Sequence, residues 1–176
     1  MTPNPSAGGP IWWDLVTSDV AGAGAAMTRL LGWELTGLSL GDEVYPVGGR
    51  GGSRWCGCVD LPQDRGLPDH WLPYLGVPDL ETACASVLAL GGSVLTGRED
   101  TPGFGVYAVC EGPKRCWFAL HQGPTPAAVS QGNAPKEGSP FGALLTSPDP
   151  AECAEFFQGL FGWTSSPTTL GQRVVL

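Results

Sequence analysis

The sequence predicts an α+β fold built from repeated β-α-β-β-β modules, and three observations support this fold class. An apolar segment that ends at an aspartate occurs three times, each time followed by a segment with helical spacing of apolar residues and then a glycine. Short alternating segments between Gly and Pro turns follow the first two copies, as expected for strands. Seven Trp, in a chain of 176 residues of which 42% are hydrophobic, favour a folded core although the chain also has 27 Gly and 17 Pro.

The three copies of this pattern span residues 11–33, 70–92 and 141–163. In the first and the last copy, the aspartate lies 14 residues before the tryptophan of a Gly-Trp pair. Each aspartate can accept hydrogen bonds from the free N–H groups of a helix start, and each glycine can end the helix. The capping residues are Asp19, Asp79 and Asp149, and the terminating residues are Gly32, Gly91 and Gly162.

Strands are predicted after the first two helices, and the chain divides accordingly. The strands cover 34–40, 43–47, 54–61, 93–96, 105–109 and 116–121, with one or two more near 173–176. A first domain at 1–123 contains module 1 (about 10–63) and module 2 (about 68–123), followed by a Pro/Gly/Ser/Ala linker at 124–139 and a partial third βαβ module at 140–176.

The charge balance excludes some partners. With 9 basic and 17 acidic residues the chain has a net charge of −8 and a pI near 4.5, which disfavours binding to nucleic acid or to an anionic membrane. No apolar run approaches the roughly 20 residues that span a bilayer, and the first residues lack the basic and apolar regions of a signal peptide. We therefore expect a cytoplasmic protein.

Six cysteines are spaced without a C-x-x-C pair, so a zinc-binding pattern is absent from the sequence. In a cytoplasmic chain they are expected to be reduced and packed as small apolar residues. Cys56 and Cys58 lie two apart on a predicted strand and therefore share a face, which leaves a redox or metal-binding role open for this pair.

Three groups of residues occur in a characteristic order along the chain. The first group is the opening segment with Asp19 and Leu31-Gly32-Trp33, and it recurs as Asp149 and Phe161-Gly162-Trp163. The second group is residues 70–79 followed by 88–95. The third is residues 102–109 followed by 112–113 and 116–120. Together they resemble the vicinal oxygen chelate superfamily, the fold of glyoxalases and bleomycin-resistance proteins, over most of residues 11–123. The resemblance implies that paired βαβββ modules form an open curved sheet, or cup, whose concave face is the ligand pocket.

Catalytic members of that superfamily hold a divalent metal in the cup by His, Gln and Glu side chains. The aligned positions here carry Trp12, Leu72 and Ala119, and the fourth falls near Cys56 and Cys58. None of the first three side chains offers a lone pair to a metal. The sequence therefore predicts a metal-free protein that lacks the superfamily's catalytic centre.

A shifted metal site is the alternative. Asp14, His70 and His121 each lie two residues from an aligned position, share its strand face, and could together hold one divalent cation. Alternatively the two histidines lie at strand ends near solvent, and Asp14 bonds a backbone group.

Without a metal, the inward residues would form an aromatic-lined binding site for a small molecule, serving sequestration, resistance or sensing. The predicted ligand-binding residues are Trp12, Asp14, His70, Leu72, Tyr74, Trp117, Ala119 and His121. Trp and Tyr rings offer flat apolar area and one donor each, which suits planar ligands. Two alternatives stay open: the rings simply fill the cup as core, or the chain is a metal-dependent lyase, isomerase, dioxygenase or thiol transferase.

Two loops and the third module complete the predictions. The glycine-rich segment 48–54 is interpreted as a hairpin loop in preference to a phosphate-binding loop, because it lacks the Lys-Ser/Thr of a nucleotide loop. Lys114-Arg115 is interpreted as a solvated turn. The third module has many apolar residues without a fourth module to cover them, so we expect a homodimer that involves residues 140–176.

Overall fold

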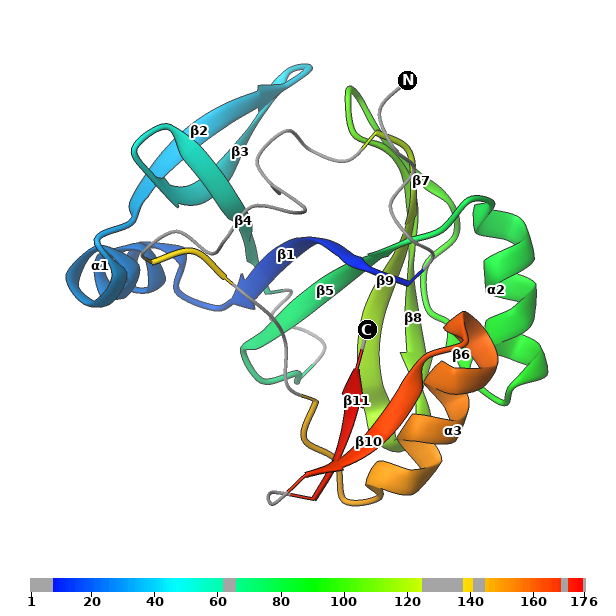
Figure 1. Cartoon of the computed structure of the whole chain (residues 1–176). Helices are drawn as coiled ribbons and strands as arrows, with labels where there is room; N and C mark the ends of the chain where they lie inside the picture. Colours follow the sequence, from blue (N-terminus) through cyan, green and yellow to red (C-terminus); the bar gives the residue numbers. More distant parts are fainter. Residues whose placement is uncertain (1–7, 62–65, 125–137, 141–144, 169–170, 176) are drawn as a thin grey trace. The chain divides into compact units, whose positions relative to one another are not determined.

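The computed structural model confirms an α+β fold and describes residues 8–61, 66–124, 138–140, 145–168 and 171–175 (Figure 1). The chain divides into two compact units. The module-1 unit comprises residues 12–73 and 125–141, and the module-2 unit comprises residues 1–11, 74–124 and 142–176.

Module 1 has the predicted β-α-β-β-β order. Its elements are β1 (Pro10–Thr17), α1 (Val20–Leu31), β2 (Glu34–Leu40), β3 (Glu43–Arg50) and β4 (Ser53–Asp60). The strands are ordered β2-β3-β4-β1; β1 runs parallel to β4, and the other neighbours are antiparallel. The loop predicted at 48–54 shrinks to a two-residue turn at Gly51-Gly52, because β3 and β4 pair up to Arg50 and Ser53.

The core of module 1 lies between the sheet and α1. Met27 of α1 packs there with Trp33, Trp55 and Cys56, and Trp13 and Leu15 of β1 lie against this cluster. The Trp33 and Trp55 ring centroids are 5.2 Å apart. Side chains alternate between the faces of a strand, so Trp12 and Asp14 lie on the opposite face of β1 from Trp13 and Leu15.

Module 2 repeats this order with one additional short strand. Its elements are β5 (His70–Gly76), α2 (Leu80–Ala89), β6 (Ser93–Val94), β7 (Glu99–Thr101), β8 (Gly105–Gly112), η2 (Pro113–Arg115) and β9 (Cys116–Gln122). β5 runs parallel to β9, and β8 is antiparallel to β9, β6 and β7. β7 is not among the predicted strands, because its residues Glu-Asp-Thr lack the apolar alternation that is typical of strands.

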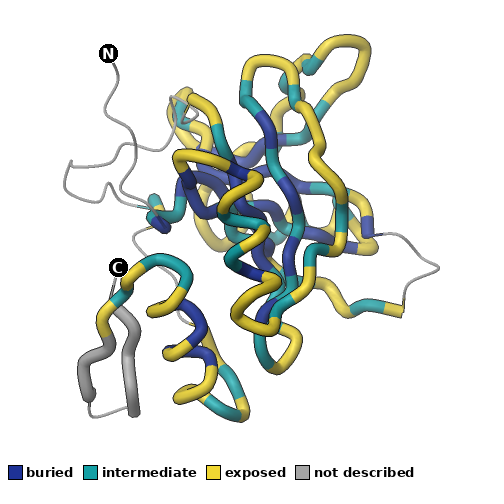
Figure 2. The backbone as a smooth tube through the Cα atoms, turned by 90° about the vertical axis from the view of Figure 1, so that its right-hand side faces the viewer, coloured by how far each residue is buried: buried dark blue, intermediate teal, exposed yellow. Residues whose placement is uncertain are grey.

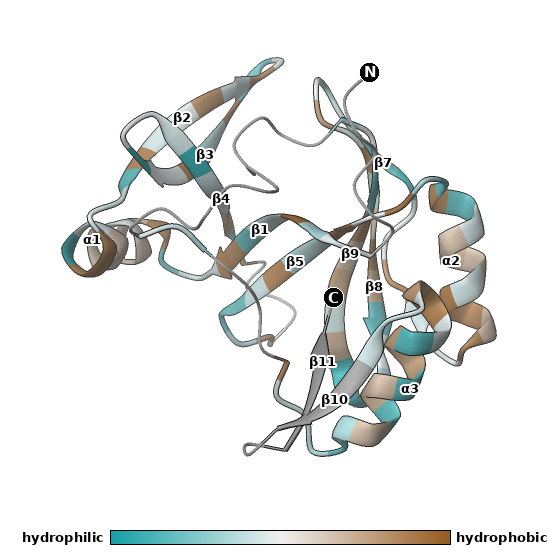
Figure 3. Cartoon of the chain, in the orientation of Figure 1, coloured by the Kyte–Doolittle hydropathy of each residue, from teal (hydrophilic) through white to brown (hydrophobic). Residues whose placement is uncertain are grey.

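The third module supplies α3 (Pro150–Phe161) and an antiparallel hairpin of β10 (Thr164–Thr168) and β11 (Gly171–Val175). Phe156 and Phe157 of α3 belong to the same core as Phe118 of β9, at centroid distances of 6.1 and 5.4 Å from its ring. One side of α3 is therefore buried and the other exposed (Figure 2), and apolar and polar residues alternate along α2 and α3 (Figure 3).

This packing accounts for most of the apolar residues on which the homodimer prediction rested. Leu160, Phe161 and Trp163 also pack against the module-2 core, whereas Leu145 is 48% exposed. Phe141 and Leu144 lie outside the described residues. The homodimer stays a prediction, but its strongest argument is weakened because α3 already buries its apolar face within one chain.

All three aspartates predicted as helix caps are confirmed. The side chains of Asp19, Asp79 and Asp149 accept hydrogen bonds from the N–H groups of Gly22, Thr82 and Glu152 at 2.8, 2.7 and 3.1 Å. Gly32 and Gly162 end their helices in the left-handed conformation, as predicted. The second helix ends at Leu90, one residue before the predicted glycine, and Gly91 follows with φ 84°.

Two further observations concern the chain as a whole. All six cysteines are free thiols; Cys84 and Cys116 are half-buried and the other four are buried. Among the described residues, no helix combines the length and apolarity that a transmembrane segment needs. The cytoplasmic location stays a prediction.

Replacing Phe157 tests the packing of the third module. Phe157 is 3% exposed and contacts Phe118, so F157A should lower the free energy of unfolding by about 3 kcal/mol, as large-to-small changes in a core do. Urea unfolding measures the change. The control is Q158A on the exposed side of α3, expected within about 0.5 kcal/mol of the wild type. Equal stability of the two variants would show that α3 does not pack as described.

Candidate functional site

The face of the module-1 sheet opposite α1 carries a hydrogen-bond network that joins three side chains. The indole N–H of Trp12 donates to Oδ1 of Asp14 at 3.0 Å and to the hydroxyl of Tyr45 at 2.9 Å. The Tyr45 hydroxyl in turn donates to Oδ1 of Asp14. We call Trp12, Asp14 and Tyr45 the β1–β3 network, because they join β1 to β3 across β4.

Gly57 of β4 makes this network sterically feasible. It lies between the two strands, paired with Asp14 of β1 and Val47 of β3. A Cβ atom at position 57 would overlap both the Tyr45 hydroxyl and the Asp14 carboxylate. A residue without a side chain is therefore required where Tyr45 crosses β4.

The surroundings of the β1–β3 network keep neighbouring groups protonated. Burial, followed by the nearby Asp14 charge, raises the pKa of Tyr45 far above its ordinary range. Burial raises the pKa of the Cys56 thiol to about 12, and burial and Asp14 raise that of Cys58. A phenol and thiols that stay neutral at pH 7 are poor nucleophiles and poor metal ligands.

Module 2 presents a second set of residues on the side of its sheet away from the helices. Phe118 and Leu120 of β9 belong to the core beneath α2 and α3, so the alternating residues Trp117, Ala119 and His121 lie on the other side. The register places Tyr74 beside Ala119 and Tyr107 opposite His121. These five residues form what we call the aromatic face, on which the Tyr74 and Tyr107 rings meet edge to face at 5.4 Å.

Polar groups surround Trp117 at one end of the aromatic face. Its indole N–H donates to Oε2 of Glu111, the residue directly opposite on β8, at 2.6 Å. The guanidinium of Arg115 lies over the Trp117 ring at 5.2 Å from its centroid, and Nε of Arg115 lies 3.8 Å from Glu111 Oε2. This end therefore combines a ring, a carboxylate and a cation.

The two histidines lie in different surroundings. His121 is 5% exposed, and its Nε2 donates to the carbonyl of Phe104 at 2.7 Å; burial lowers its pKa. Nδ1 of His70, at the start of β5, donates to the carbonyl of Pro68 at 2.8 Å. In each histidine the ring nitrogen named here must carry the proton, because a carbonyl oxygen can only accept a hydrogen bond.

The side chains do not fit a divalent metal at the positions that the superfamily resemblance indicated. Trp12, Leu72 and Ala119 are buried and have no lone pair to give. Asp14 accepts hydrogen bonds within the β1–β3 network, and both histidines already engage one ring nitrogen. Across the part of the chain that is described, no three His, Cys, Asp or Glu side chains are grouped so that they could hold a metal ion.

Of the eight predicted ligand-binding residues, only some are open to solvent. Five are buried: Trp12, Asp14, Leu72, Ala119 and His121. Tyr74, Trp117 and His70 are half-buried. Sequence reasoning missed Tyr45, Tyr107, Glu111 and Arg115. Tyr107 and Glu111 could have been found from the β8–β9 hairpin register, which sets them opposite His121 and Trp117, whereas Tyr45 requires the pairing of β3 with β4.

Comparisons with known proteins agree with this architecture. No family model matches the chain. It is 29% identical over 111 residues to "Putative glyoxylase CFP32" of Mycobacterium tuberculosis, covering 62% of this chain and 42% of that protein. It is also 29% identical over 127 residues to "Anthracycline biosynthesis protein DnrV" of Streptomyces peucetius, covering 64% of this chain and 46% of that protein.

Solved structures show the same fold. The Mn(II)-bound glyoxalase from Novosphingobium aromaticivorans matches 92% of this chain and 54% of its own, with a TM-score of 0.62 and 18% identity. A 4-hydroxymandelate synthase mutant from Streptomyces coelicolor matches 92% of this chain and 55% of its own, with a TM-score of 0.59 and 16% identity. The chain shares the fold of these proteins, and its sequence resembles the vicinal oxygen chelate superfamily. The chain spans less than half the length of the curated relatives that it matches.

Gly57 provides a direct test of the β1–β3 network. G57A should lower the free energy of unfolding by about 2 kcal/mol, because the new methyl group displaces the Tyr45 hydroxyl from Asp14 and overpacks the site. Chemical denaturation measures the loss. In G97A the added Cβ meets no atom within 4 Å, so this control should stay within about 0.5 kcal/mol of the wild type. A G57A variant as stable as G97A would contradict the described network.

His121 should make stability depend on pH. Its folded pKa lies below the unfolded value near 6.5, so the unfolded chain binds a proton first as the pH falls. The contribution of His121 to the free energy of unfolding is fully present above about pH 6.5. It is lost as the pH falls from there through the folded pKa. H121Q keeps a donor for the Phe104 carbonyl without titrating, and should flatten this part of a stability profile between about pH 7.5 and 5.

The matched control for this profile is H70Q, which replaces the chain's other histidine and should keep the wild-type slope. If H121Q and the wild type lose equal stability over the same pH interval, His121 is not the group responsible.

Proposed function

We propose that this chain is a metal-independent binding protein for small planar aromatic molecules, which it would sequester or sense. The observation that carries the proposal is the chemistry of the aligned metal positions. The first position carries the indole of Trp12, whose N–H is donated within the β1–β3 network. The other two carry the isobutyl group of Leu72 and the methyl group of Ala119, both buried. Such groups favour apolar and stacking contacts over ion coordination.

The aromatic face is the best-supported contact surface for such a ligand. Ala119 is fully buried, so the middle of the face is packed, whereas Tyr74, Tyr107 and Trp117 are half-buried. Trp117 is the preferred stacking platform, because Glu111 accepts its N–H and a planar ligand would therefore meet an aromatic ring whose donor is already paired.

A metal-dependent enzyme of the same superfamily is the second candidate. The glyoxalase found in the structural comparison is Mn(II)-bound, and one sequence relative carries glyoxylase in its name. Under this candidate a divalent ion would need donors other than the three aligned side chains. The metal content of the purified protein separates the two candidates.

The binding proposal is tested with 2-naphthol as a neutral planar probe, using tryptophan fluorescence and ligand-detected NMR. W117A should weaken binding at least about tenfold, as expected for loss of an aromatic contact worth about 1.4 kcal/mol. The matched control is W71A, because Trp71 is 48% exposed and lies on the opposite face of β5 from Tyr74. Wild-type protein that does not bind 2-naphthol, or equal binding by both variants, would refute the assignment of Trp117.

A further inference from the structure

The turn between β8 and β9 has an unusual backbone. Its two central residues, Lys114 and Arg115, have φ values of 55° and 60°. The N–H of Cys116 donates to the carbonyl of Pro113 and closes the turn. Positive φ at both central positions is the requirement of a type I′ turn, which normally selects Asn-Gly or another glycine-containing pair.

The left-handed conformation costs free energy at each residue that has a Cβ atom. Another hairpin of the same chain avoids that cost: the turn between β3 and β4 uses Gly51 and Gly52, with φ values of 60° and 80°. A Lys-Arg pair in the corresponding role at the β8–β9 turn therefore indicates that the side chains themselves are needed.

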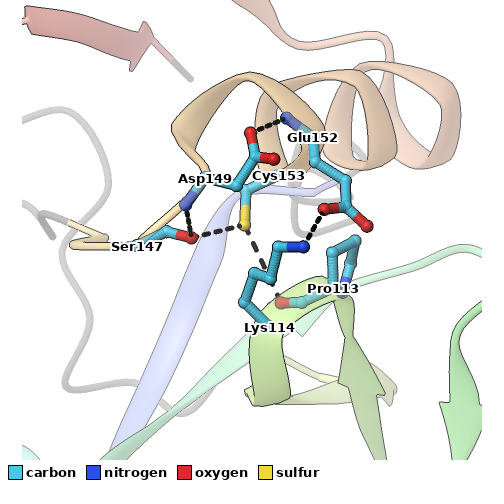
Figure 4. Close-up of polar contacts among 6 residues, drawn as sticks. All are labelled: Pro113, Lys114, Ser147, Asp149, Glu152 and Cys153. Carbon is cyan, nitrogen blue, oxygen red and sulfur yellow. Dashed lines mark hydrogen bonds and ion pairs between the residues drawn. The ribbon is translucent and has the colours of Figure 1, made fainter.

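Lys114 has a structural explanation. Its Nζ forms an ion pair with Oε2 of Glu152 at 2.6 Å, and the adjacent Pro113 carbonyl accepts from the thiol of Cys153 (Figure 4). Both contacts join the turn to the first turn of α3, which belongs to the same compact unit. Lys114 thus helps to fix the third module on module 2.

Arg115 has no comparable structural explanation. Its side chain is 70% exposed, and it contacts the Trp117 ring and, through Nε, the Glu111 carboxylate at 3.8 Å. Exposed ion pairs and cation–π contacts of this kind contribute little to stability. The ion pair with Glu111 is measured at Nε, and the guanidinium has further N–H donors with which it can bind a carboxylate bidentately.

We propose that Arg115 binds an ionised carboxylate on the planar aromatic ligand whose ring stacks on Trp117. The inference rests on the proposed function and names the chemical class of its ligand, an aromatic carboxylate. Lys114-Arg115 is the only pair of adjacent basic residues in a sequence with a net charge of −8, so the turn attracts an anion locally although the chain as a whole repels it.

The test compares 2-naphthoate with the neutral 2-naphthamide, using fluorescence titration of the full chain. Wild-type protein should bind the carboxylate about tenfold more tightly than the amide, as expected for charge-assisted hydrogen bonds. R115G should abolish this preference while its thermal midpoint stays level or rises, because glycine relieves the left-handed strain. K114N should keep the preference, since Lys114 contacts α3.

The outcomes separate this inference from the proposed function. If the wild type binds neither compound, the proposed function fails. If it binds both equally and R115G changes nothing, aromatic binding stands and the role of Arg115 is overturned. A fall in the R115G thermal midpoint that parallels its loss of binding would also overturn it, because Arg115 would then be structural.

Discussion

The hydrogen bonds between Trp12, Asp14 and Tyr45 set the chemistry available to module 1. The superfamily resemblance aligns a metal-ligand position of the opening strand with Trp12, whose indole N–H is donated to the chain's own carboxylate and phenol. Gly57 admits the network, and burial keeps Tyr45 and both nearby thiols protonated. The polar groups of this face therefore satisfy one another, and a cation would have to displace these bonds to bind there.

Module 2 combines a rigid support with a partly open surface. The helix side of its sheet is filled by Phe118, Leu120 and the two phenylalanines of α3, which hold β9 in place. The other side exposes parts of three aromatic rings, with a carboxylate and a guanidinium beside Trp117. The aromatic face also carries His121, whose Nε2 is hydrogen-bonded to the carbonyl of Phe104.

Much of the fold could be predicted from the sequence because its signals are local. An aspartate cap and the Gly-Trp pair that follows it lie within about 14 residues of each other, so this spacing alone predicts the helices and the modules. The β1–β3 network could not be predicted, since Tyr45 reaches Asp14 only after β3 and β4 pair. The sequence left the position of α3 open: apolar residues show that a helix must be covered, but not whether a second chain or Phe118 of its own chain covers it. Lys114-Arg115 was interpreted as a solvated turn because the sequence does not reveal the sign of φ.

The most direct measurement of the central claim is the metal content of the protein, purified without chelators and analysed by mass spectrometry of the elements. Because indole, isobutyl and methyl groups stand at the aligned donor positions, we expect no stoichiometric divalent ion and an unchanged thermal midpoint after dialysis against EDTA. One equivalent of a transition metal, whose removal lowers the thermal midpoint, would contradict it.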